Sequence, residues 1–94
     1  MNTLYYANLI AWFTLAMAGK LSDNSHKGGW RGCTRRYLLR RLGQEKAELE
    51  RAIKRGATKA EVIAEAADVA NFAMMLADTY EEPVEKTKRV KSAP

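Results

Sequence analysis

Cysteine and histidine are almost absent from this sequence, which has one of each among its 94 residues. Cys33 has no partner for an internal disulfide, and a single thiol cannot build a thiolate cage around a metal ion. These shortages exclude a disulfide-stabilised scaffold. They fit a protein of a reducing compartment.

Charge is absent from the N-terminal run between Leu4 and Ala18. The run is shorter than the ~20 residues that a membrane span needs, contains Asn8, and is closed by Lys20. No Lys or Arg precedes it, as a secretory signal would require. We therefore expect a buried helix over residues 3–21, rather than a membrane-anchored accessory protein or a signal peptide.

Apolar and basic residues are plentiful instead. Hydrophobic residues make up 47% of the chain, which is rich for a short monomer and indicates self-association. The formal net charge of +5 favours an anionic partner, either a nucleic acid or a small phosphorylated ligand. Part of this charge lies in residues 86–91, so charge alone does not choose between these partners.

Two further helices are indicated by their end signals. Residues 22–34 are rich in Ser, Asn, Asp and Gly and read as a loop. Thr34 can cap a second helix that runs to about Arg55 and ends at Gly56, the residue type preferred just past a helix C-terminus.

The third helix begins with a capping-box pattern, in which Thr58 is followed three residues later by Glu61. It continues to about Tyr80, and Pro83 prevents much extension. Residues 82–94 form a charged tail.

The expected fold is one all-α domain over residues 1–81, built from an N-terminal helix and a helical hairpin. The third helix is apolar around almost its whole circumference, so it must be covered on all sides. We expect a homodimer in which hairpins pack into a four-helix bundle, or a homotetramer made by doubling it.

Two pairs of acids lie at equal distances from the hairpin turn at residues 56–57. In an antiparallel hairpin, Glu45 falls opposite Asp68 and Glu48 falls opposite Glu65. Each pair also has i, i+3 spacing, which places its members on one face of their helix. The four carboxylates are therefore expected to converge.

Four facing carboxylates in an apolar setting repel one another unless they are protonated or neutralised by a cation. Either ExxE or ExxD alone would be typical of a solvated helix face. Their symmetric placement favours a metal site instead. Oxygen ligands without nearby His or Cys select Mg²⁺, with Mn²⁺ as a substitute.

The paired motif resembles that of the MazG-like, all-α nucleoside triphosphate pyrophosphohydrolases, in which EExxE is followed on the next helix by ExxD. Here the motifs read Q-E-K-A-E, from Gln44 to Glu48, and E-A-A-D, from Glu65 to Asp68. The resemblance extends over about residues 24–80 and includes features of small phage-encoded members. Gln44 departs from the family pattern, which has Glu there.

The resemblance implies hydrolysis of a nucleoside triphosphate, a deoxy one such as dGTP, to the monophosphate and pyrophosphate. Glu45, Glu48, Glu65 and Asp68 would hold two or more Mg²⁺ ions, which favour attack of water on the α-phosphorus. Glu48 or Glu45 would orient or deprotonate that water. The location would be the cytoplasm, of the host if the chain is phage-encoded.

Five other residues are candidates for substrate binding. Lys27, Arg31 and Arg35 could reach the triphosphate, although surface charges that keep the protein soluble would look the same. Trp30 could stack on the base or serve as a packing anchor. Asn71 is expected to contact the nucleotide, or otherwise to make a polar contact in the core.

The main alternative is a basic three-helix DNA-binding regulator without catalytic activity. Its recognition helix would carry four arginines: Arg35, Arg36, Arg40 and Arg41. The same helix carries Glu45, Glu48 and Glu50, which would repel phosphates. We therefore expect no stable nucleic-acid complex.

Overall fold

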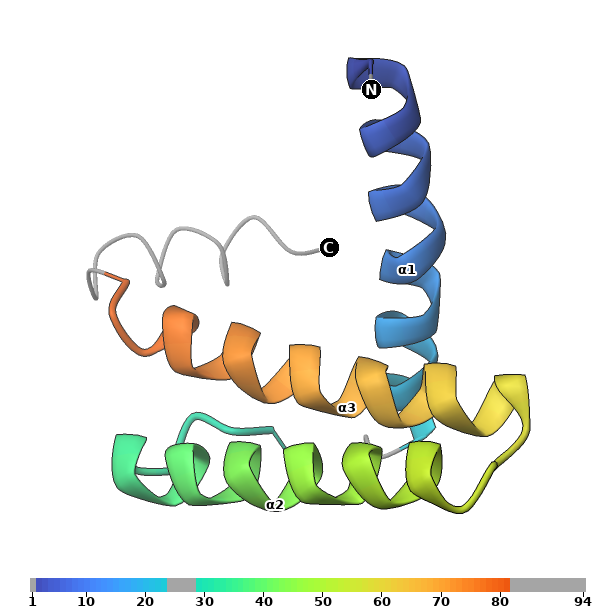
Figure 1. Ribbon diagram of the computed structural model, residues 1–94. Helices are drawn as coiled ribbons and strands as arrows, with labels where there is room; N and C mark the ends of the chain where they lie inside the picture. Colours follow the sequence, from blue (N-terminus) through green and yellow to red (C-terminus); the bar gives the residue numbers. More distant parts are fainter. Residues whose placement is uncertain (1, 24–28, 82–94) are drawn as a thin grey trace.

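The computed structural model describes residues 2–23 and 29–81, and this part of the chain is all-helical (Figure 1). The elements in chain order are α1 (Thr3–Asp23), α2 (Arg35–Lys54) and α3 (Lys59–Asp78). The expected all-α class is confirmed. The charged tail of residues 82–94 lies outside the described residues.

Helix α2 begins and ends as its sequence predicts. The Thr34 side chain accepts a hydrogen bond from the backbone N–H of Tyr37 at 3.0 Å. At the other end, Gly56 adopts a left-handed φ of 69°. The backbone N–H of Ala57 then donates to the carbonyl of Ala52 at 2.9 Å, which closes the helix with the Schellman pattern. A residue with a Cβ atom would be strained at this glycine.

Helix α3 begins with the predicted capping box. The Thr58 hydroxyl accepts from the backbone N–H of Glu61, whose carboxylate accepts in return from the backbone N–H of Thr58. Arg55 strengthens this corner through a 3.0 Å ion pair with Glu61. The helix ends at Asp78, slightly before the expected Tyr80.

Helices α2 and α3 form an antiparallel hairpin, and α1 packs only against α3 among the described elements. In Figure 1 the C-terminal part of α1 meets α3, while its N-terminal part leads away from the hairpin. The fully buried apolar residues are few, namely Leu38, Ala52 and Ala67. Two polar residues, Glu45 and Asn71, are also buried.

The expectation that α1 would be buried is wrong for the single chain. The helix forms over almost the expected residues, but none of its residues is buried. The reason is that α1 contacts one neighbour only, through the end nearer α2 and α3. Its large exposed apolar side chains are Leu4, Tyr5, Tyr6, Leu9, Ile10, Trp12 and Leu15.

Although α1 is long and apolar, no helix within residues 2–23 and 29–81 has the combination of length and hydropathy needed to cross a membrane.

Because the core is small, two adjacent leucines should differ strongly in their contribution to the free energy of unfolding. Leu38 is 1% exposed, whereas Leu39 is 61% exposed. Leu38→Ala should lower the free energy of unfolding by about 3 kcal/mol, because it leaves a cavity between the hairpin helices. Leu39→Ala should change it by less than about 0.5 kcal/mol. Chemical denaturation followed by circular dichroism measures both, and equal effects would contradict this packing.

Candidate metal centre

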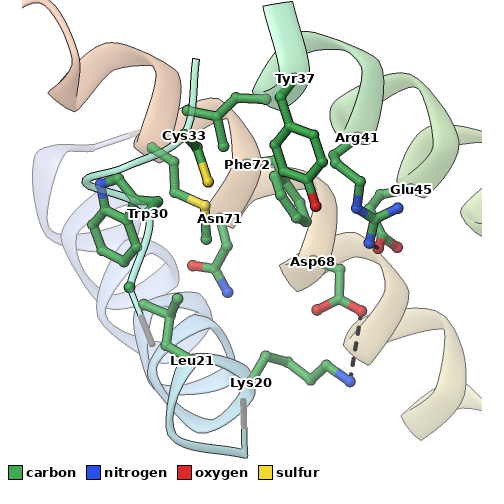
Figure 2. A pocket seen from close by; sticks show the side chains of 13 residues that line it. Lys20, Leu21, Trp30, Cys33, Tyr37, Arg41, Glu45, Asp68, Asn71 and Phe72 are labelled. Carbon is green, nitrogen blue, oxygen red and sulfur yellow. Dashed lines mark hydrogen bonds and ion pairs between the residues drawn. The ribbon is translucent and has the colours of Figure 1, made fainter. Parts of the chain in front are cut away.

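Three carboxylates from the two arms of the hairpin meet in one cluster. Glu45 on α2 and Glu65 and Asp68 on α3 each place one oxygen within 4.8 Å of the others. The symmetric spacing about the turn predicts that four carboxylates converge, and three of the four do so. Figure 2 shows Glu45 and Asp68 approaching from different helices.

Glu48, the fourth predicted carboxylate, lies at the outer edge of the cluster. Its side chain is exposed, and it is not one of the three whose oxygens lie within 4.8 Å. Its negative charge nevertheless raises the pKa values of Glu45 and Glu65. It also raises the pKa of Asp68, so Glu48 is close enough to interact with all three inner carboxylates while facing solvent.

Two oxygens of the inner carboxylates lack the partners that buried oxygens normally have. Glu45 is only 6% exposed. Its Oε2, like Oε2 of Glu65, is buried and has no hydrogen-bond partner within the described part of the chain. Because an unpartnered buried carboxylate oxygen is costly, protonation or a bound cation would stabilise this arrangement. The all-oxygen donor set fits Mg²⁺ or Mn²⁺.

Burial and mutual repulsion raise the pKa values of all three inner carboxyls. For Glu45, burial is the largest cause, followed by Glu48 and the charge of Asp68, and together they outweigh Arg41 and raise its pKa to about 7. Burial also raises the pKa of Glu65, with repulsion from Glu48 and Asp68. It raises the pKa of Asp68 against the opposing effect of Lys20.

Two basic side chains partly neutralise the cluster. Lys20 Nζ, from α1, lies 3.5 Å from Asp68 Oδ2. Arg41 Nη2, from α2, lies 2.8 Å from Glu45 Oε1, and the guanidinium also stacks 5.0 Å from the centre of the Phe72 ring. Sequence reasoning assigned neither residue to the site. The i, i+4 spacing of Arg41 and Glu45 could have indicated their pair, whereas Lys20 comes from a distant helix.

A pocket of about 820 Å³ adjoins the cluster (Figure 2). It lies among all three helices and the segment that precedes α2. Its lining residues are Lys20, Leu21, Gly29, Trp30, Cys33, Tyr37, Leu38, Arg41, Glu45, Asp68, Asn71, Phe72 and Met75. Charged groups therefore line one side, and aromatic and apolar side chains line much of the remainder.

Trp30 and Asn71, two of the predicted substrate-binding residues, line this pocket. The indole N–H of Trp30 donates to Asp78 Oδ2 at 3.0 Å, so the ring is also anchored to α3. The Asn71 amide donates to the carbonyl of Met17 at 3.0 Å. Its Oδ1 is buried without a partner among the described residues. Both side chains thus have structural contacts as well as a surface toward the pocket.

Two of the predicted phosphate-binding cations, Arg35 and Arg31, lie away from this pocket. Arg35 donates to Oγ1 and the carbonyl oxygen of Thr79 and stacks 3.7 Å from the centre of the Tyr80 ring. It joins the start of α2 to the end of α3 and does not line the pocket. Arg31 is exposed and lines a second hollow of about 560 Å³ beside Asp78. Lys27 lies outside the described residues.

Comparisons with protein-family models, with curated proteins and with solved structures find no match to this chain. The geometry of the cluster and pocket and the resemblance of the two acidic motifs are therefore the features that bear on function.

The raised pKa values predict how the metal-free protein responds to pH. Up to a pH of about 7 the folded protein retains a proton on Glu45, whereas the unfolded chain releases it near 4.5. Between these values the folded state binds more protons, so its free energy of unfolding falls as pH rises, by on the order of 2 kcal/mol. In EDTA, Tm measured by circular dichroism should therefore decrease from about pH 5 to about pH 8.

Two variants separate this effect from other titrations. Glu45→Gln removes the carboxyl whose pKa is raised to about 7 and should flatten the pH dependence of Tm. Glu50→Gln changes an exposed carboxylate on the same helix and should preserve it. A wild-type Tm that increases over this range would contradict the assignment.

Proposed function

We propose that this protein is a metal-dependent nucleoside triphosphate pyrophosphohydrolase that acts on a (deoxy)nucleoside triphosphate. The observation that carries the proposal is the cluster of Glu45, Glu65 and Asp68, whose oxygens lie within 4.8 Å at one side of a pocket. Water would attack the α-phosphorus, the bond from this phosphorus to the α–β bridging oxygen would break, and the monophosphate and pyrophosphate would leave.

The size and lining of the pocket support a nucleotide as ligand. Its volume of about 820 Å³ lies within the usual range of small-molecule sites, roughly 300–1,000 Å³. Trp30, Tyr37 and Phe72 offer aromatic surface for a base, and Lys20 offers positive charge for a phosphate. A base directed to the aromatic side would leave its polyphosphate near the carboxylate side.

The proposed chemistry divides between the metal and the chain. Bound Mg²⁺ would supply charge for the phosphoryl oxygens and a water of lowered pKa. Glu45, Glu65 and Asp68 would hold it, with Glu48 as a further ligand at the exposed edge. Glu48 or Glu45 would orient the attacking water and accept its proton. Arg41 keeps Glu45 in place through their 2.8 Å ion pair.

The DNA-binding alternative has less support from the contacts. Of its four proposed arginines, Arg35 bonds to Thr79 and Arg41 bonds to Gln44 and Glu45. These two guanidinium groups already have partners inside the protein, so a phosphate backbone would have to compete for them.

The carboxylates provide the direct test of the enzyme proposal. Pyrophosphate release should be measured with each common NTP and dNTP. Chelation should abolish turnover, Mg²⁺ or Mn²⁺ should restore it, and Ca²⁺ should support little rate because of its looser geometry. Glu45→Gln and Asp68→Asn should each lower kcat by at least about 100-fold, because each removes a proposed metal ligand.

Glu50→Gln is the matched control, since it removes a carboxylate from the exposed face of α2. It should retain wild-type turnover, and circular dichroism should show that all three variants keep their helices. Full activity in excess EDTA would overturn the metal mechanism. Normal turnover by both cluster variants would make the carboxylates structural.

We further propose that the chain functions as a two-fold dimer, in which hairpins form a four-helix bundle, or as a tetramer built from it. Two features support self-association. Helix α3 is apolar at most positions, yet Ala67 is its only buried apolar residue. Within residues 2–23 and 29–81, seven of the eleven exposed large apolar side chains lie on α1. A second copy would remove much of this surface from water.

Light scattering at micromolar concentration tests the assembly. The wild type should be a dimer or larger. Leu15→Glu places a charge on α1 at a side chain that is 74% exposed in the single chain, and it should dissociate the oligomer if α1 lies in the interface. Leu39→Glu makes the same change at an exposed position of α2 and tests whether the hairpin contributes to the interface. A stable, active wild-type monomer would contradict the proposal.

A further inference from the structure

The balance of charge around the carboxylates is incomplete. Four acidic side chains gather there, namely Glu45, Glu48, Glu65 and Asp68. Among the described residues, the basic side chains that face them are Lys20 and Arg41. When all six groups are ionised, negative charge therefore exceeds positive charge. This excess favours the binding of a cation.

A second observation separates this cluster from an ordinary acidic surface. Glu45 is 6% exposed, and the ion pair with Arg41 is made through its Oε1. Its Oε2 is buried without a hydrogen-bond partner in the described part of the chain. The internal cations therefore do not satisfy the buried ligand atoms, so a cation still has a buried oxygen to bind.

The two internal cations are held differently. Arg41 lies 2.8 Å from Glu45, also donates to Gln44, and stacks on Phe72. Lys20 lies farther from its carboxylate, at 3.5 Å from Asp68, and its side chain is 30% exposed. An ammonium group on a flexible four-carbon stem can be repositioned more easily than a planar guanidinium.

Lys20 is also placed between two kinds of ligand. Figure 2 shows its ammonium beside the Asp68 carboxylate and its stem along the edge of the pocket. Asp68 is one of the three clustered carboxylates, so a divalent cation held there would repel this ammonium. The pocket that Lys20 lines offers the displaced group a nearby position, in which an anion would attract it.

We propose that Lys20 is an exchangeable counter-ion: it neutralises Asp68 in the metal-free protein, and a divalent cation displaces it toward the pocket, where it binds a phosphate of the ligand. This inference rests on the metal centre of the proposed function and adds an order to binding. Metal binding releases the lysine, and the released lysine then strengthens anion binding.

The exchange predicts that one substitution at Lys20 has opposite effects on the affinities for metal and for phosphate. Lys20→Met keeps much of the apolar stem but removes the charge. Without nucleotide, the affinity for Mn²⁺ should increase about fivefold, as expected when one partly exposed ion-pair partner no longer competes. With Mn²⁺ saturating, the affinity for inorganic tripolyphosphate should decrease about fivefold, because its cationic partner is missing.

Both affinities can be measured on the full chain by isothermal titration calorimetry, with electron paramagnetic resonance to count free Mn²⁺. Lys20→Arg, which keeps the charge, should show Mn²⁺ affinity close to wild type. Lys54→Met makes the same charge change on the exposed surface of α2 and should leave both affinities unchanged. If Lys20→Met loses helical circular dichroism, Lys20→Gln takes its place.

Each outcome is decisive. Mn²⁺ affinity that rises in Lys20→Met but not in Lys54→Met, together with weaker tripolyphosphate binding, supports the exchange. Unchanged or weaker Mn²⁺ binding by Lys20→Met overturns it while leaving the metal centre intact. Stronger Mn²⁺ binding without weaker tripolyphosphate binding also overturns it. Absence of Mn²⁺ binding by every variant overturns the metal centre and the exchange together.

Discussion

The left-handed backbone of Gly56 is the constraint on which the rest of the structure depends. It closes α2 with a Schellman pattern and allows the Thr58 capping box to start α3 almost at once. Such a short connection fixes the register of the two helices. Because the register is fixed, acids spaced symmetrically about the turn must meet, and their repulsion must be offset by the surroundings.

The acidic cluster therefore departs from the apolar pattern of the hairpin around it. Apolar side chains such as Leu38 and Ala52 are buried along the same face of α2 as Glu45. A leucine at position 45 would satisfy hydrophobic patterning. Glu45 instead has a raised pKa, and its Oε2 has no hydrogen-bond partner among the residues that the structure describes. Such departures from local consistency are typical of functional sites. This departure from the apolar pattern is the physical reason for proposing a functional role for these residues.

The parts that the sequence predicts are those that depend on neighbours along the chain. Caps at Thr34 and Thr58, the stop at Gly56 and the meeting of Glu45 with Asp68 all follow from local spacing. The sequence does not predict contacts between residues far apart in the chain, and the packing of α1 is the main example.

The place of α1 could not be derived because its sequence is apolar on most faces, so no single stripe identifies the side that packs. For this reason the exposure of α1 and the contact of Lys20 with Asp68 were not foreseen. The Arg35 contact with Thr79 likewise joins residues far apart in sequence. A cation that bridged Glu45 and Asp68 would cross-link the two helices and close the loop between these residues, as a disulfide would. Unlike a disulfide, this cross-link would be reversible. The stability that it added would depend on the concentration of free metal.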